Sequence, residues 1–187
     1  MNVKRTFVLP LVVLTSICLI VSAALAYMNM ITSPVISTAA AERAQVTMSE
    51  KMPDATGFQT IELSELSGHA DIPASIREAY KTSNDIGYIL IAAVNGFSGD
   101  ITIICAIDNG GKIISTATLS HTETKGIGTI LEEDSFLDTF TGIDDKLEGV
   151  DTVTGATIST RAFIHGIEDI FNAFDIISKD SQWGVSR

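Results

Sequence analysis

The sequence predicts an α+β protein, with an N-terminal transmembrane helix followed by a single domain in which helices pack on an antiparallel sheet. Three observations lead to this prediction. A long uncharged apolar run lies near the N-terminus, apolar segments separated by turn signals fill the middle of the chain, and apolar residues recur at spacings of three and four near the C-terminus. With 187 residues, the chain has room for one domain plus an anchor.

The apolar run extends from residue 7 to residue 30, and no charged residue occurs between Arg5 and Glu42. A helix of about 20 apolar residues crosses a bilayer, so the run predicts a transmembrane anchor. Because Lys4 and Arg5 precede it, we expect a cytoplasmic N-terminus and an extracytoplasmic C-terminal domain. A cleaved signal peptide with Ala24-Leu25-Ala26 at its end is the alternative, although signal cores span only about 7–15 residues.

The segment after the apolar run carries weaker signals. Pro34 predicts a break in the helix, and residues 39–48 could form a short helix or a stalk. Residues 58–63 alternate as a strand does, and residues 74–81 are read as one or two helical turns. His69 is interpreted as a solvated loop residue, and no chemistry is assigned to this segment.

Three buried strands are expected next, at residues 86–94, 101–107 and 112–119. Gly-rich and Asn-rich turns at residues 95–100 and 108–111 separate them. Strands joined by such turns favour an antiparallel sheet.

Two helices complete the predicted domain. A short one is expected at residues 136–140, and a long one begins near Ser159, where apolar residues recur with helical spacing up to Ile177. The long helix is expected to cover one face of the sheet.

Composition excludes some functions. The formal net charge is −11, which argues against nucleic-acid binding, because that function requires a basic surface. Acidic residues between 132 and 151 are interpreted as a solvated surface, and no metal site is predicted because no known ligand spacing occurs. Cys18 and Cys105 lie in separate apolar segments, so we expect no disulfide and a buried, unreactive Cys105.

The most informative stretch is residues 151–160, directly before the long helix. Three small residues, Thr154, Gly155 and Ala156, leave room for a ligand, and hydroxyl side chains follow. A helix N-terminus carries unpaired N–H groups and a partial positive charge, which suit a phosphate. The alternative is that Thr157 or Ser159 is only a helix N-cap.

Two motifs resemble those of a known family. Asp-x-x-Thr-Gly-Ala-Thr, at residues 151–157, resembles the flavinylation motif of the FMN-binding domain family. Residues 121–128 resemble its His-x-Glu-Thr-Pro-Gly-Leu-Gly loop, with Lys125 in place of proline and Ile127 in place of leucine. The motifs occur in family order, and the similarity extends from about Ile86 to Phe174.

The resemblance implies FMN bound covalently, with its phosphate esterified to Thr157. The sequence contains no Walker loop and no histidine beside Thr157, so we interpret the chain as the substrate of a separate flavin transferase. The resemblance implies that this enzyme uses FAD and magnesium. Asp151 is expected to orient the motif for that enzyme or to hold its metal, unless it only forms a turn before Val153.

The remaining candidate cofactor-binding residues come from both motifs. They are Thr154, Gly155, Ala156, Ser159 and Thr160 around the phosphate, and Glu123, Thr124, Gly126, Ile127 and Gly128 in the opposite loop. Glu123 either contacts flavin or fixes its own loop. Lys125 makes the loop less rigid than proline would and adds a positive charge that could raise the flavin's potential. His121 is interpreted as a strand-end residue rather than a catalytic one.

The resemblance implies an electron relay anchored in the cell membrane. The family includes one subunit each of Rnf-type ferredoxin:NAD oxidoreductases and of sodium-pumping NADH:quinone reductases, and the compact length favours the Rnf type. No nicotinamide-binding fingerprint occurs, so we expect no complete active site on this chain alone and electron exchange with other membrane subunits. A standalone covalent-FMN carrier outside the cytoplasm, a quinone-reductase-type subunit and an anchored module without redox function are the alternatives.

The expected division of the chain follows from these readings. It comprises a cytoplasmic N-terminus (1–6), the transmembrane anchor (7–30), a stalk and N-terminal part of the extracytoplasmic region (31–84), the FMN-binding domain (85–178) and a C-terminal tail (179–187).

Overall fold

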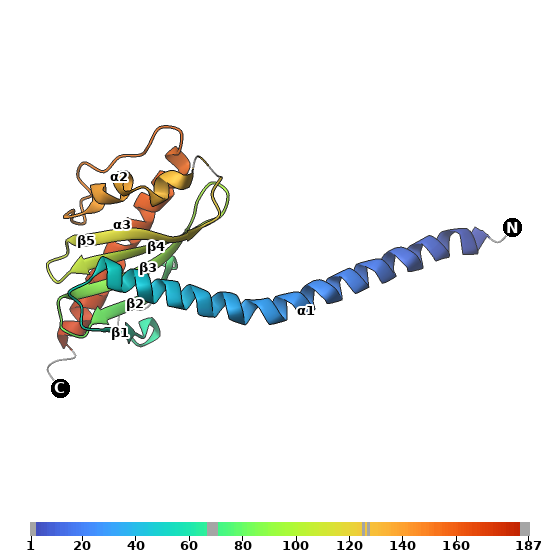
Figure 1. The fold of residues 1–187 in the computed structure, drawn as a ribbon, viewed down its shortest axis with the longest axis horizontal. Coiled ribbons are helices and arrows are strands. Elements are labelled where there is room, and N and C mark those ends of the chain that lie inside the picture. Colours follow the sequence, from blue (N-terminus) through green and yellow to red (C-terminus); the bar gives the residue numbers. More distant parts are fainter. Residues whose placement is uncertain (1–2, 67–70, 125, 127, 184–187) are drawn as a thin grey trace. The chain divides into compact units, whose positions relative to one another are not determined.

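A 49-residue helix, α1 (Val3–Lys51), opens the chain in the computed structural model (Figure 1). The structure describes residues 3–66, 71–124, 126 and 128–183, so that His69, Lys125, Ile127 and the last residues of the predicted tail lie outside the described residues. The chain divides into two compact units, Met1–Arg43 and Ala44–Arg187.

Within the first unit, α1 contains a segment long and apolar enough to cross a membrane. This segment, Pro10–Ser33, has 24 residues and a mean hydropathy of 2.4, and none of it is buried. The predicted break at Pro34 is wrong, because α1 continues through it to Lys51. A proline removes only one helical hydrogen bond, and the alanine-rich stretch that follows has high helix propensity.

The second unit is organised around a five-stranded antiparallel sheet whose strand order follows the sequence. Its strands are β1 (Phe58–Ile61), β2 (Ile76–Thr82), β3 (Gly87–Asn95), β4 (Asp100–Asp108) and β5 (Ile113–His121). The α+β class with an antiparallel sheet is therefore confirmed. So are the strand predicted at residues 58–63 and the three predicted at 86–119.

The prediction of helical turns at residues 74–81 is wrong, because this segment forms β2. Ala79 is fully buried and pairs with Leu90 on β3, so that tertiary pairing overrides the weak local pattern. A register shift between Ile76 and Glu78 also interrupts the strict alternation that would have indicated a strand.

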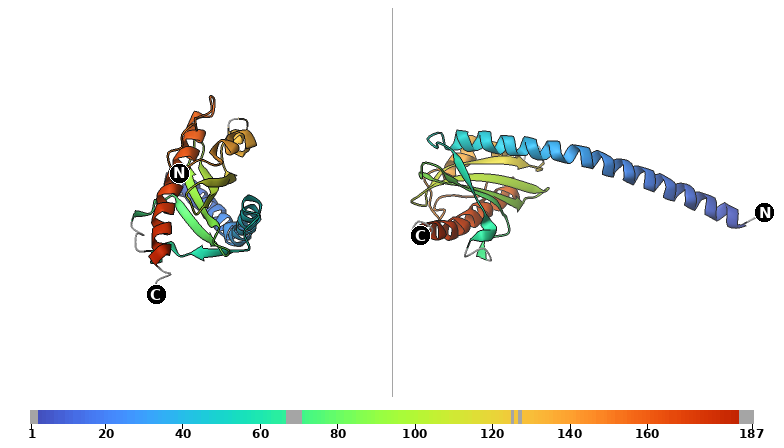
Figure 2. Two further views of the ribbon diagram at one scale, coloured as in Figure 1. Left: turned by 90° about the vertical axis from the view of Figure 1, so that its left-hand side faces the viewer. Right: turned by 90° about the horizontal axis from the view of Figure 1, so that it is seen from below.

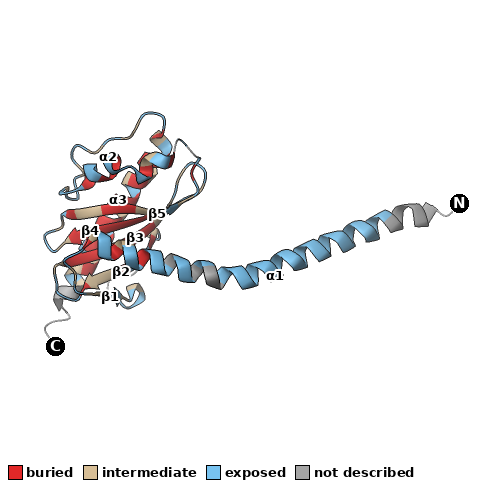
Figure 3. Ribbon diagram, in the orientation of Figure 1, coloured by how far each residue is buried: buried red, intermediate tan, exposed pale blue. Residues whose placement is uncertain are grey.

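Both faces of the sheet are covered, which explains why β3 and β4 are apolar without alternation. Leu90 and Ala92 belong to a core formed with α3 (Thr157–Trp183). Ile89 and Ile91 face the opposite side, where they pack with Met48 in the last turn of α1 and with Met52 directly after the helix. Figure 2 shows α3 and the end of α1 on opposite sides of the sheet, and Figure 3 shows the buried residues concentrated in its strands.

Short helices close the α3 side of the domain. They are η1 (Leu63–Glu65), η3 (Gly128–Glu132), α2 (Asp134–Leu137) and η4 (Asp138–Phe140). The last two correspond to the short helix predicted at residues 136–140. Phe136 packs edge-on against Phe140 and against Phe163 of α3, and Phe140 packs against Phe163 with tilted rings; the ring centroids are 5.2–5.3 Å apart. These contacts fix the start of α3 beside the sheet.

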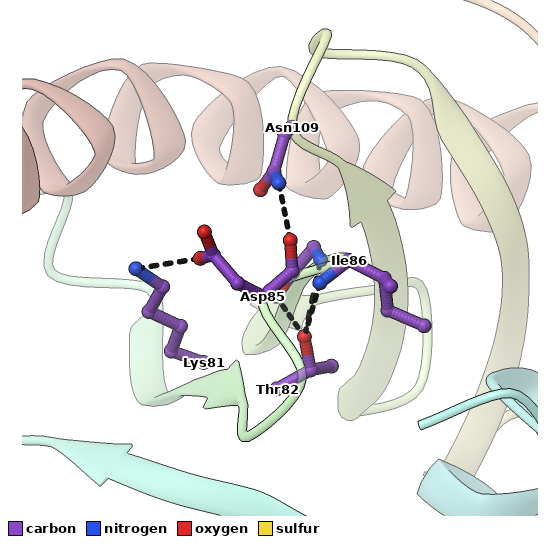
Figure 4. A network of polar contacts seen from close by, with 6 residues as sticks. Lys81, Thr82, Asp85, Ile86 and Asn109 are labelled. Carbon is purple, nitrogen blue, oxygen red and sulfur yellow. Dashed lines mark hydrogen bonds and ion pairs between the residues drawn. The ribbon is translucent and has the colours of Figure 1, made fainter. Parts of the chain in front are cut away.

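Side chains from β2, from the turn itself and from the β4–β5 turn stabilise the turn between β2 and β3 (Figure 4). Buried Thr82 accepts hydrogen bonds from the N–H groups of Ile86 and Gly87 at 3.0 and 3.1 Å. Lys81 forms an ion pair with Asp85 at 2.8 Å, and Asn109 donates to the Asp85 carbonyl. These contacts tie the β2–β3 turn to the β4–β5 turn, at Asp108–Lys112.

Candidate functional site

The loop before α3 owes its shape to Gly155. Its φ angle is +91°, a conformation that residues with a side chain rarely adopt, and open space surrounds the position of a Cβ atom. The glycine is therefore required by the backbone conformation. Ala156 is buried, and its N–H donates to the Val153 carbonyl at 3.0 Å.

Two of the predicted phosphate-binding hydroxyl groups form hydrogen bonds within the domain. Thr160 is fully buried; its Oγ1 donates to the Ala156 carbonyl at 3.0 Å and accepts from the Val153 N–H at 3.2 Å. Ser159 is also buried and donates to Glu123 Oε2 at 2.7 Å. Both side chains fix the loop before α3 and the first turn of the helix.

Thr154 and Thr157 are the more accessible hydroxyl groups of the motif. Thr154 is exposed, and Thr157 is half-buried as the first residue of α3. The Oγ1 atom of Thr157 lies 3.4 Å from the Val153 carbonyl, at the long limit of a hydrogen bond. Because N–H groups in a first helical turn lack partners within the helix, a phosphate on Thr157 would have donors beside it.

Two hollows flank the Gly155-Ala156 pair. One of about 210 Å³ is lined by Gly126, Thr129, Ile130, Glu133, Val153, Thr154, Gly155 and Ala156. The other, of about 270 Å³, is lined by Phe97, Gly155, Ala156, Thr157, Ile158 and Ser159. The loop of the second motif therefore contributes to the first hollow through Gly126, and the β3–β4 turn contributes to the second through Phe97.

Glu123 connects the two motifs. Its Oε1 accepts from the N–H groups of Phe97 and Ser98 at 2.7 and 3.2 Å, and its Oε2 accepts from the Ser159 hydroxyl. Burial raises the pKa of Glu123, but the hydrogen bonds from Ser159, Ser98 and Phe97, with a smaller contribution from His121, hold the pKa below its usual value. The carboxylate is thus stabilised in its charged form inside the protein.

The rest of the second motif surrounds this carboxylate. Thr124 is exposed, with its hydroxyl 3.0 Å from that of Ser98, and its carbonyl accepts from the Gly128 N–H at 2.9 Å. A Cβ atom at Gly128 would lie 2.1 Å from Glu123 Cβ, which explains the glycine by close approach. Ile127 and Lys125 lie outside the described residues.

His121 and Asp151 have local partners. His121 ends β5, as predicted; its Nδ1 accepts from the Glu123 N–H at 3.2 Å and its Nε2 lies 3.1 Å from Glu132 Oε1. Exposed Asp151 accepts from the Thr152 N–H at 2.6 Å through Oδ1. This contact orders the start of the loop, while the Asp151 side chain remains exposed.

Two apolar residues close to Thr157, Phe97 and Ile158, were not among the residues predicted for the site. Phe97 is 61% exposed and Ile158 is 56% exposed, although both are large hydrophobic side chains in an otherwise well-packed domain. Phe97 lies in a segment whose glycines and asparagine indicated only a turn. The available signal was an aromatic residue within that turn.

Within residues 3–66, 71–124, 126 and 128–183, no group of three or more His, Cys, Asp or Glu side chains could hold a metal ion. Cys105 is buried, as expected, and burial raises the pKa of its thiol. The fold and this site define a small α+β ligand-binding domain, with its site at the start of a long helix.

Comparison with known protein families identifies the family to which this domain belongs. The family model described as FMN-binding domain matches residues 96–172, which include both motifs. The G-type subunit of the proton-translocating ferredoxin:NAD(+) oxidoreductase complex of Clostridium ljungdahlii is 30% identical over 83% of this chain and 85% of its own length. The chain belongs to the FMN-binding domain family.

One further sequence relative agrees with this assignment, and one solved structure shares the fold. The G-type subunit of an ion-translocating oxidoreductase complex from Vibrio parahaemolyticus is 36% identical, over 43% of this chain and 44% of that relative. The crystal structure of NqrC from Shewanella oneidensis has the same fold, with a TM-score of 0.53 over 73% of this chain and 88% of that one, at 17% identity.

Proposed function

We propose that this chain is the G-type flavoprotein subunit of an Rnf-type ion-translocating oxidoreductase complex and relays electrons through an FMN attached covalently to Thr157. One observation carries the proposal. Thr157 is a half-exposed hydroxyl at the first position of α3, two residues after Gly155 with its φ of +91°, and it lines the 270 Å³ hollow. The similarity to the clostridial G-type subunit over most of both chains supports the setting in a complex.

The residues present fit the flavin phosphate. The small side chains of Gly155 and Ala156 leave the backbone of the loop open, and the N–H groups of the first turn of α3 offer donors to an anion. Bound FMN supplies redox chemistry with one or two electrons, which no amino-acid side chain here provides. The chain holds and orients the cofactor, while Ser159 and Thr160 keep the attachment loop rigid.

Attachment requires a second protein. A flavin transferase would present FAD and magnesium; Thr157 Oγ1 attacks the FMN phosphorus, the bond to AMP breaks, AMP leaves and the hydroxyl proton is released. Exposed Asp151 would orient the loop for that enzyme or bind its metal. Thr157 lies at the surface, where such an enzyme can reach it.

The membrane setting follows from α1. Pro10–Ser33 would span the bilayer, Lys4 and Arg5 would stay in the cytoplasm, and residues 44–187 would lie on the opposite side of the cell membrane. A covalent bond keeps the flavin from diffusing away on that side. Other membrane subunits of the complex would deliver and accept the electrons.

Flavin fluorescence on a denaturing gel tests this function. The full chain is co-produced with an exported flavin transferase, beside Thr157→Ala, Thr157→Ser and Thr154→Ala variants. We expect a fluorescent band in the parent and in Thr154→Ala, none in Thr157→Ala, and partial retention in Thr157→Ser, which keeps a hydroxyl. A dark parent band would contradict the proposal, as would equal fluorescence in Thr157→Ala.

A further inference from the structure

Glu123 joins three segments that are distant in sequence. It follows β5, its Oε1 holds the β3–β4 turn through the N–H groups of Phe97 and Ser98, and its Oε2 holds Ser159 on α3. The side chain is 7% exposed, so water cannot replace these donors readily. Since both carboxylate oxygens already have protein partners, this side chain is better suited to positioning than to contacting a cofactor.

The backbone around Glu123 is shaped to admit it. A Cβ atom at Gly96 would lie 2.1 Å from Glu123 Oε1, and one at Gly128 would lie 2.1 Å from Glu123 Cβ. Atoms at that separation clash, so two glycines allow the β3–β4 turn and the second motif to close on the carboxylate.

Phe97 is the side chain that this arrangement places at the site. Its N–H donates to Glu123 Oε1 at 2.7 Å, while its side chain remains mostly exposed and lines the 270 Å³ hollow with Ile158 and Thr157. An exposed aromatic ring at the tip of a turn gains nothing from the core of the domain.

The ring of the flavin is the occupant that fits this hollow. Thr157, which would hold the phosphate, is part of its wall, and its other large side chains, Phe97 and Ile158, are apolar. The hollow on the other side of Gly155 contains Glu133, whose negative charge would oppose electron uptake by a flavin.

Resting on the proposed function, we propose that Glu123 is a positioning residue, whose carboxylate fixes Phe97 against the start of α3 so that Phe97 and Ile158 cover the ring of an FMN held on Thr157. Aromatic and aliphatic side chains stack on such rings and exclude water from their faces. Loss of Glu123 therefore uncovers the flavin without removing its attachment site.

The test measures how well acrylamide, a neutral quencher, reaches the flavin. Full-length protein carrying covalent flavin is purified in detergent as parent, Glu123→Ala, Phe97→Ala, the double variant, Glu123→Gln and the control Glu148→Ala, which changes an exposed carboxylate. We expect quenching to rise towards that of free FMN in Glu123→Ala and Phe97→Ala, and to be no greater in the double variant, because the two residues act together. Glu123→Gln should retain protection, since its amide can replace all three contacts.

The denaturing gel of the same samples separates the two proposals. A parent without covalent flavin would overturn the proposed function, and the inference with it. Attached flavin with parent-like quenching in both Glu123→Ala and Phe97→Ala would overturn the positioning role alone. Should Glu123→Ala fail to fold, Phe97→Ala decides: a rise in quenching supports the inference and parent-like quenching overturns it.

Discussion

The hydroxyl residues of the loop before α3 differ in how accessible they are. They are Thr154, Thr157, Ser159 and Thr160. Ser159 and Thr160 are buried and hydrogen-bonded within the domain, so that a phosphate would have to displace existing bonds to reach them. Thr157 has one long contact and Thr154 is exposed. At the scale of single residues, Thr157 therefore combines access with the position at the start of α3.

Gly155→Ala should destabilise the domain by about 1–2 kcal/mol, because a side chain disfavours positive φ. The position has open space for a methyl group, so the loss reports backbone strain. Urea unfolding measures it, with Gly110→Ala as a control at a turn glycine for which no positive φ occurs. Equal effects of both substitutions would contradict the role of the φ angle.

Glu123→Gln should cost about 1–2 kcal/mol of unfolding free energy at neutral pH, the difference between charged and neutral hydrogen bonds. The folded-state pKa of Glu123 lies below its ordinary value of 4.5, so its contribution is present above that value and is lost as the pH falls through the folded-state pKa. The gap between parent and variant should therefore close in acid. A gap independent of pH would show that the charge of Glu123 does not stabilise the fold.

At the scale of elements, the sequence predicted what local patterns encode. Strands β3, β4 and β5 are apolar runs separated by glycine turns, and α3 has a regular apolar stripe. Strand β2 was missed, because Arg77, Glu78 and Lys81 obscure its buried positions and only pairing with β3 makes it a strand. The predicted helix break at Pro34 is wrong, because α1 continues to Lys51 and the alanine-rich stretch that follows has high helix propensity.

Packing of the end of α1 on the sheet gives a prediction for this element. Met48 is 2% exposed and lies in the apolar cluster with Ile89 and Ile104, so Met48→Ala should cost about 2–5 kcal/mol by leaving a cavity. Met30→Ala, at a residue 74% exposed in α1, is the matched control and should change the unfolding midpoint little. Equal midpoints for both variants would mean that α1 does not pack on this face.

At the scale of the whole molecule, the chain consists of a unit whose long apolar helix could span a bilayer and a domain that carries the site. The domain begins at Ala44, because Ala44, Met48 and Met52 complete the core on one face of the sheet. A protein beginning at residue 44 should stay soluble and folded, whereas one beginning at residue 53 should aggregate through the uncovered face. Size-exclusion chromatography and circular dichroism distinguish these outcomes, and two well-folded proteins would show that the end of α1 is dispensable.

As with the fold, the features of the site that local sequence encodes could be predicted, and those that depend on distant contacts could not. Both motifs could be found from residue order, including Thr157 and Glu123. The partners of Glu123 could not, because Ser159 lies 36 positions away and Phe97 lies 26 positions away. Contacts at such separations depend on the folded sheet, which local sequence does not specify.

Mass spectrometry of residues 147–161 tests the central claim most directly. Cleavage after Lys146 and Arg161 releases one peptide that contains Thr152, Thr154, Thr157, Ser159 and Thr160. In protein made with a flavin transferase, we predict that this peptide gains the mass of one FMN less one water, and that fragmentation places the gain on Thr157. An unmodified peptide, or a gain on another of these hydroxyl residues, would contradict the assignment of Thr157 as the flavin attachment site.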